Sequence, residues 1–170
     1  YPASAKSKVI SAEPVTVYSS APANVLYARW GKGFSKITLD KQGGTDGDDV
    51  VYFKWNAQYN LDLTWYQDEE CTTAYPHNEN NEYSITPPTK KGYTFAGYFK
   101  EPDTTDKDKQ ATWPGGTSYG GGFQGIANEA GCSNDATAYA VWTPKTIHIT
   151  LDQNSGSNGT SDLWYSYGTN

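Results

Sequence analysis

The stretch LYARWGKGFSKITLD at residues 26–40 returns near the other end of the chain as AYAVWTPKTIHITLD at residues 138–152. Continued to Trp55 and Tyr167, the two stretches align without a gap at an offset of 112 positions. From Tyr27 onward they share nine identities in 29 positions, several times the number expected by chance. Self-similarity at a fixed period indicates tandem modules, and this period is far longer than the about 20–50 residues of solenoid repeats.

The repeat predicts how the chain is divided. We expect one complete unit at residues 31–142, the C-terminal part of a preceding repeat at residues 1–30, and the N-terminal part of a following repeat at residues 143–170. The units should be separate modules arranged like beads on a string.

Short strands account for most of the unit. KITLD at 36–40 alternates apolar and polar residues, and a Gly/Asp-rich turn separates it from the aromatic run VVYFKW at 50–55, so a hairpin is predicted. GYTFAGYF at 92–99 and TAYAVW at 137–142 are two further strand candidates. GFQGIANEA at 122–130 is the best helical candidate. The expected fold class is therefore β-rich α+β.

These motifs carry a resemblance to a known family. ITLDKQGG at 37–44, PPTKKGYTFAGYF at 87–99 and AYAVW at 138–142 resemble the internalin-type B repeat of bacterial surface and secreted proteins. The resemblance implies a small β-grasp (ubiquitin-like) repeat module that is exported and serves as a spacer, adhesion or interaction element. The chain departs from the family in length, with expected insertions at about 56–85 and 100–131.

Of the two cysteines, Cys71 lies in the first insertion and Cys132 lies directly after the second. In an exported protein a disulfide between them is expected, which would tie the two insertions together. Two unpaired thiols are the alternative, and the C-x-x-C spacing of a metal site is absent.

Catalytic patterns are weak. The Cys71–His77 pair lies in polar loop sequence, and the G-x-G-x-x-G match at 120–125 lacks the preceding strand that a dinucleotide site needs. Asp62, Glu69 and Glu70 are acids on an acidic chain rather than an evident glycosidase pair. The sequence therefore predicts a protein that is not an enzyme and has no cofactor.

The acidic turn of the first repeat is a possible calcium site. Its four carboxylates, Asp40, Asp46, Asp48 and Asp49, could converge on a hard cation, but their spacing does not match an EF-hand. A solvated hairpin turn is the favoured interpretation, and no metal is predicted.

Aromatic side chains in the insertions are the candidate ligand-contact residues. Trp65, Tyr66, Trp113 and Tyr119 lie in polar sequence, where exposed rings could stack on sugars or anchor an interface. The alternative is that such rings pack the insertions back onto the sheet.

Composition limits the partners. The formal charge of −6 disfavours nucleic acid, and no apolar run is long enough to span a membrane. The predicted function is a non-enzymatic tandem repeat module of a secreted or surface bacterial protein, acting as a spacer, adhesion or protein-interaction element. Its expected partners are other repeats of the same protein and a host or environmental protein or glycan. The alternative is a carbohydrate-binding module that uses the exposed aromatics.

Overall fold

The computed structural model describes residues 33–56, 60–132 and 134–168. The expected preceding repeat at 1–30 lies outside them. In chain order, the elements are β1 (Phe34–Asp40), β2 (Val50–Lys54), β3 (Tyr93–Phe99), the short 3-10 helix η1 (Lys107–Lys109), α1 (Gly122–Ala130), β4 (Ala136–Pro144), β5 (Thr146–Thr150) and β6 (Asp162–Ser166).

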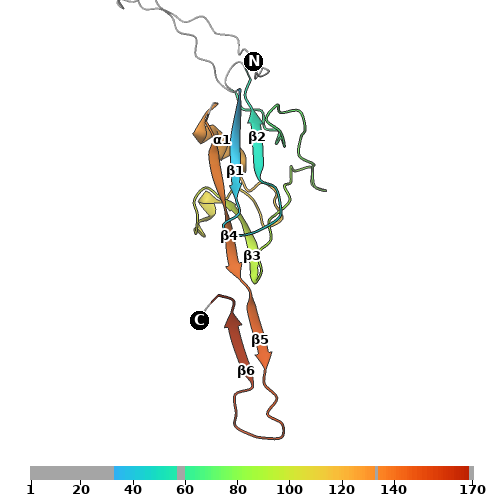
Figure 1. The fold of residues 1–170 in the computed structure, drawn as a ribbon, viewed down its shortest axis with the longest axis vertical. Helices are drawn as coiled ribbons and strands as arrows, with labels where there is room; N and C mark the ends of the chain where they lie inside the picture. The colour runs from blue at the N-terminus through green and yellow to red at the C-terminus, as the bar shows by residue number, and fades with distance from the viewer. Residues whose placement is uncertain (1–32, 57–59, 133, 169–170) are drawn as a thin grey trace, which may run out of the picture.

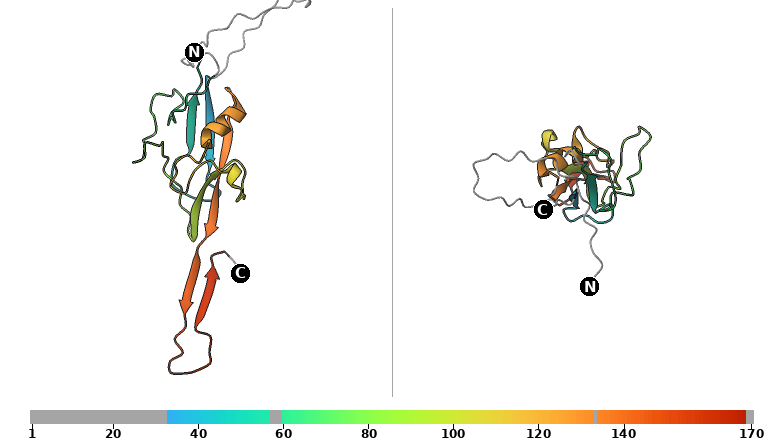
Figure 2. Two further views of the ribbon diagram at one scale, coloured as in Figure 1. Left: turned by 180° about the vertical axis from the view of Figure 1, so that it is seen from behind. Right: turned by 90° about the horizontal axis from the view of Figure 1, so that it is seen from above.

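Four strands form one mixed sheet in the order β2-β1-β4-β3 (Figure 1). β1 pairs antiparallel with β2 and parallel with β4, while β3 pairs antiparallel with β4. The sheet curls into a half-barrel. β5 and β6 form a separate antiparallel pair that extends from the end of β4 along the long axis of the molecule (Figures 1 and 2).

The alternation seen in the sequence sets which side chains of β1 and β2 enter the core. Ser35, Ile37 and Leu39 are buried on one face of β1, and Val51 and Phe53 are buried on the same face of β2. A period of two places alternate side chains on opposite faces of a strand, so one face can be apolar throughout. The predicted hairpin is confirmed.

β3 contains a bulge at Gly97. The pairing with β4 shifts register between Phe95 and Gly97, and Gly97 has a φ of 125°. A Cβ at this position would collide with the carbonyl oxygen of Thr112, so only glycine allows the loop to approach the strand this closely.

Both expected insertions contribute to the core. Trp65, Tyr75 and Ile85 are buried from the first insertion, and Ala111 and Phe123 are buried from the second. The Trp65 ring lies between the ring of Phe53, at 6.5 Å and edge-on, and the ring of Phe123, at 4.9 Å. These segments therefore cover the sheet instead of projecting from it.

The β-grasp expectation is wrong. In the described residues the α-helix content is limited to α1, which has nine residues and contacts β1 and β4 at the end of the sheet where those strands begin (Figure 2). Gly122, Gly125 and Asn128 are weak helix formers, and the helix ends at Gly131, whose φ is 82°. Loop aromatics such as Trp65 and Tyr75 complete the core, and the mixed sheet curls as a half-barrel.

Candidate functional site

The strongest candidate site is the hairpin of β5 and β6, here called the second hairpin (residues 145–167). It has the same strand pairing as the first hairpin of β1 and β2 (residues 33–55). Residues 112 positions apart are called equivalent below. The pairs run from Phe34↔Lys54 to Thr38↔Val50 in the first hairpin, and from the equivalent Thr146↔Ser166 to Thr150↔Asp162 in the second.

Hydrogen bonds outside the strand ladders are repeated as well. The amide of Trp55 donates to the carbonyl of Gly33 at 3.0 Å, and the amide of Tyr167 donates to the carbonyl of Lys145 at the same distance. Three more hydrogen bonds of the first hairpin have an equivalent in the second. Leu39 N donates to Asp49 O as Leu151 N does to Ser161 O, and Gly44 N donates to Lys41 O as Gly156 N does to Gln153 O. Gln42 N donates to Asp40 Oδ1 as Asn154 N does to Asp152 Oδ1.

The two loops also share their unusual backbone conformations. Gln42 and Asp46 have φ values of 48° and 56°, and their equivalents Asn154 and Asn158 have values of 43° and 67°. Few non-glycine residues adopt positive φ, and Asn and Asp are enriched among those that do. The second loop therefore reproduces the first although most of its side chains differ.

The two hairpins differ in how far their apolar faces are buried. Ile37 and Val51 of the first hairpin are fully buried, whereas the equivalent Ile149 and Leu163 are 44% and 47% exposed. Ile147 and Leu151 on the same face are also exposed. The structure leaves this apolar face of the second hairpin open to solvent.

The second hairpin is anchored at its base to β3. The amide of Lys145 donates to the carbonyl of Gly92 at 2.9 Å, and the Tyr167 ring packs edge-on against Tyr93 at 5.3 Å. A Cβ on Gly92 would collide with the Tyr167 ring, and the φ of Gly92 is 79°. This close approach positions the hairpin as an extension of β4.

The opposite face of the second hairpin holds a polar and aromatic cluster. His148 stacks on Trp164 at 4.1 Å between ring centroids, and its Nε2 lies 2.7 Å from an oxygen of Asp162. Hydrogen bonds from Ser161 and then His148 lower the pKa of the Asp162 carboxyl. The His148 side chain points outward and is 40% exposed.

The structure separates the four candidate aromatics. Trp65 is fully buried and stacks on Tyr83 at 6.1 Å, so it belongs to the core. Tyr66 is half-buried, and its hydroxyl donates to Asp62 at 3.0 Å. Burial raises the pKa of Asp62, but hydrogen bonds from Thr64 and Tyr66 lower this pKa by more than burial raises it. The net shift of the pKa is therefore downward.

Trp113 and Tyr119 remain as a surface pair. Trp113 is 48% exposed, and its ring meets the half-buried Tyr119 ring edge-on at 4.5 Å. The amide of Trp113 donates to the carbonyl of Thr117 at 2.8 Å, which closes a tight turn. The structure therefore brings these two candidate residues together.

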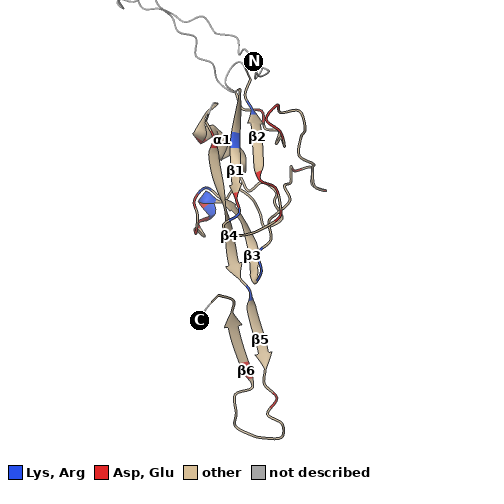
Figure 3. Ribbon diagram, in the orientation of Figure 1, with Lys and Arg blue, Asp and Glu red and all other residues tan. Residues whose placement is uncertain are grey.

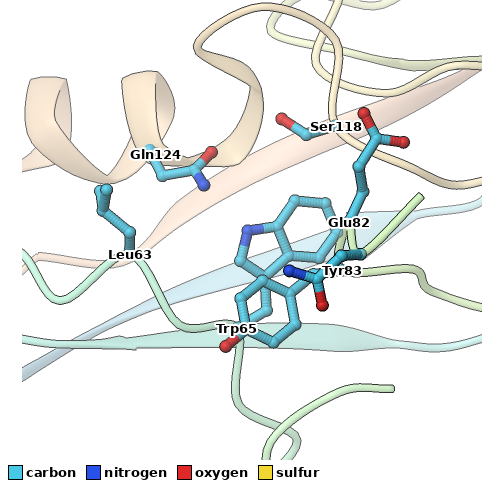
Figure 4. Close-up of a pocket in the computed structure, with 7 residues that line it drawn as sticks. Leu63, Trp65, Glu82, Tyr83, Ser118 and Gln124 are labelled. Carbon is cyan, nitrogen blue, oxygen red and sulfur yellow. The ribbon is translucent and has the colours of Figure 1, made fainter. Parts of the chain in front are cut away.

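A small hollow lies over the buried indole of Trp65 (Figure 4). Its volume is about 250 Å³, below the roughly 300–1,000 Å³ of most ligand pockets. The side-chain amide of Gln124 donates through its nitrogen to the carbonyl of Gly121 at 3.1 Å and accepts through its oxygen from Trp65 Nε1 at 3.2 Å. The residues that line the hollow are Leu63, Trp65, Asn81, Glu82, Tyr83, Ser118 and Gln124.

The two cysteines are not joined. Cys71 is buried in the loop region between β2 and β3, and Cys132 is half-buried after α1. No disulfide links them in the described part of the chain, so the expected tie between the insertions is not present in this structure.

The carboxylates of the acidic turn bind different partners and do not converge on one point. Asp46 accepts from the hydroxyls of Thr89 and Thr45, at 2.7 and 3.1 Å. Asp48 accepts from the amide of Thr86, and Asp49 pairs with Lys41 at 2.6 Å. Within residues 33–56, 60–132 and 134–168, no group of three or more His, Cys, Asp or Glu side chains is placed to hold a metal ion.

No protein-family model, curated protein or solved structure matches the chain. None of the helices in the described residues has the length and apolar character needed to cross a membrane. Function is therefore argued from the two hairpins and the surface aromatics.

Proposed function

We propose that the chain is a non-enzymatic module of a tandem array, similar in sequence to internalin-type B repeats, within an exported bacterial surface protein. The observation that carries the proposal is that the second hairpin repeats the register and the loop hydrogen bonds of the first. A spacer, adhesion or protein-interaction role follows from a chain built of such units.

The geometry favours a spacer. β1 begins at one end of the long axis, and the second hairpin leaves at the other end (Figure 1). Ile37 pairs with Ala136, and its equivalent Ile149 lies 13 residues further along β4 and β5. At about 3.3 Å per strand residue, each unit adds about 40 Å to the array.

A chain with one additional unit tests this proposal. Residues 33–144 are placed twice in succession and followed by residues 145–168, so that Gly33 of the second unit follows Pro144 of the first, at the position equivalent to Lys145. Small-angle X-ray scattering should show a maximum dimension about 40 Å longer than that of the one-unit chain. A control with a flexible Gly/Ser segment inserted between the two units, before the second copy of Gly33, should lose the fixed increment. A two-unit chain no longer than one unit would contradict the proposal.

Glycan binding is a second candidate because of the Trp113–Tyr119 pair. An exposed indole supported by a second ring offers a flat apolar surface for a sugar ring. Calorimetric titration with polysaccharides should show binding that is lost in Trp113→Ala. Trp164→Ala is the matched control, since it removes an exposed indole from the second hairpin and should leave binding unchanged. Equal loss in both variants would place the glycan elsewhere.

A further inference from the structure

The hollow over the buried indole of Trp65 lies in an acidic part of the chain. Residues 60–85 provide five of the seven residues that line it, and residues 110–124 provide the other two. The second segment has no charged side chain, and the first has no Lys or Arg. The acidic residues of the first segment are Asp62, Asp68, Glu69, Glu70, Glu79 and Glu82. Figure 3 shows acidic but no basic residues in the loops at the right of β2. The surroundings of the hollow therefore disfavour an anionic ligand and attract a cation.

The hollow has an apolar side and a polar side. In Figure 4, Leu63 lies at one side, and Glu82 and Ser118 lie at the other. The rings of Trp65 and Tyr83 lie between them. Leu63 is 62% exposed, so it presents apolar surface at the rim. An occupant with an apolar stem and a polar end would match both sides.

Three polar side chains at the hollow can accept a further hydrogen bond. The Glu82 carboxylate accepts from Asn78 through Oε2 at 3.0 Å, and its Oε1 has no partner among the described residues. The side-chain amide of Asn81 and the hydroxyl of Ser118 also line the hollow, and neither has a hydrogen-bond partner in the described part of the chain. Both ends of the Gln124 amide, in contrast, are engaged. The hollow therefore offers three acceptor oxygens, one of which carries negative charge.

A primary ammonium on an apolar stem fits this combination. It has three N–H donors and no acceptor, and in a lysine side chain it is joined to a flexible four-carbon stem that packs along apolar surface. A guanidinium fits less well, because its planar fork binds a carboxylate best through both oxygens. One oxygen of Glu82 is already bound to Asn78. The volume of about 250 Å³ leaves room for one side chain rather than for a drug-sized ligand.

We propose that this hollow binds one lysine side chain of a partner protein. The stem of the lysine lies along Leu63 and Tyr83, and its ammonium lies at Glu82. An ion pair that is open to solvent adds little affinity, so a single lysine should bind in the millimolar range. The inference rests on the protein-interaction role within the proposed function, and it gives that role a partner of defined chemistry.

An NMR titration of the isotope-labelled full chain tests the proposal. The probe is the peptide Gly-Gly-Lys-Gly-Gly with both ends blocked, so that the lysine ammonium is its sole charge. The reporter is the Nε1–H of Trp65, which lies at the hollow and donates to Gln124. Its resonance should shift saturably at millimolar peptide. A peptide with norleucine in place of lysine retains the apolar stem but has no ammonium, so it should cause no saturable shift.

Two variants of the hollow and one matched control locate the contact. Glu82→Gln keeps the shape of the side chain and removes its charge, so it should raise the Kd of the lysine peptide by about two- to fivefold. Leu63→Ser removes the apolar rim at an exposed position and should also weaken binding. Glu79→Gln is the control, because Glu79 is an exposed acid of the same loop that does not line the hollow. This control should bind the peptide like wild type.

Several results would overturn the inference. A Trp65 resonance that does not shift with the lysine peptide excludes the contact, and an equal shift with the norleucine peptide would show that the ammonium is not recognised. Equal weakening in Glu82→Gln and Glu79→Gln would indicate a general attraction of cations to the acidic loop. Tighter binding of methyl glucoside or of cadaverine would identify a sugar or a free polyamine as the occupant. Each of these results would leave the increment of about 40 Å in the two-unit chain unaffected, so the two proposals fail separately.

Discussion

The first and second hairpins share their backbone but not their surroundings. Equivalent residues form the same strand pairs and the same loop hydrogen bonds. Ile37 is fully buried, however, while Ile149 is 44% exposed. Hairpin geometry is thus set by local sequence, mainly by the alternation and by the turn residues. Burial is set by strands and loops that come from elsewhere in the chain.

The comparison also separates two sources of stability. The first hairpin is covered by β4 and by the rings of the insertions. The second is held by its own ladder and by its contact with Tyr93 and Gly92. A two-stranded hairpin is marginal by itself. Identical substitutions at equivalent positions should therefore have unequal effects.

The largest difference is expected for isoleucine to alanine. Ile37→Ala removes a fully buried side chain and should lower the free energy of unfolding by about 2–5 kcal/mol. Ile149→Ala should lower it by less than about 0.5 kcal/mol. Urea denaturation followed by Trp fluorescence measures both, at concentrations where the chain is monomeric. Equal losses would mean that the second hairpin folds into the core in solution.

Glycine to alanine in the two loops gives a smaller difference. At Gly44 the new Cβ would meet the Trp142 ring at 2.5 Å, and overpacking of this kind costs about 1–3 kcal/mol. In Gly156→Ala the new Cβ would meet only the carbonyl oxygen of Gln153. A Cβ at Gly44 would meet the carbonyl oxygen of the equivalent Lys41 in the same way, so this contact is common to both substitutions. The difference between the losses of unfolding free energy in Gly44→Ala and Gly156→Ala therefore measures the contribution of the groups that cover the first loop. No difference would show that Trp142 moves aside without cost.

Much of the local structure could be predicted from the sequence. Alternation at 36–40, the turn before Val50 and the helix at 122–130 all depend on neighbouring residues, and the structure has them. The offset of 112 places the same local pattern at residues 145–167, and that pattern folds into a hairpin in the same way.

The contents of the core and the candidate site could not be predicted in the same way. Trp65 and Trp113 both lie in polar sequence, yet Trp65 is in the core and Trp113 is on the surface. Their difference comes from Phe53 and Phe123, which are distant in sequence and close to Trp65 in space. The β-grasp expectation was wrong for a related reason, because the loops rather than a long helix cover the sheet.

A hydrogen-bond relay in the first hairpin should produce an effect of about 1–2 kcal/mol. Trp55 Nε1 donates to Ser35 Oγ at 2.8 Å, and Ser35 donates to the carbonyl of Gly131 at 2.9 Å. Ser35→Ala leaves the indole without its acceptor and the carbonyl without its donor. The equivalent residue is the exposed Ile147, so Ile147→Ser should change stability by less than about 0.5 kcal/mol. Thermal and urea denaturation compare the two, and a neutral Ser35→Ala would show that water replaces the relay.

Acid sensitivity of the first loop is the smallest expected effect. Hydrogen bonds from Thr89 and then Thr45 lower the pKa of Asp46 below its ordinary 3.8. Because the folded pKa is the lower one, the stabilisation is fully present above pH 3.8 and is lost as the pH falls through the folded value. Asp46→Asn installs the residue that the second loop has at Asn158 and should remove this part of the acid dependence. Urea midpoints measured from pH 5 downward, with an NMR titration of the Asp46 carboxyl, test it. An unchanged acid dependence in Asp46→Asn would assign the effect to other carboxylates, with Asp62 as the next to substitute, since its pKa is also lowered in the folded state.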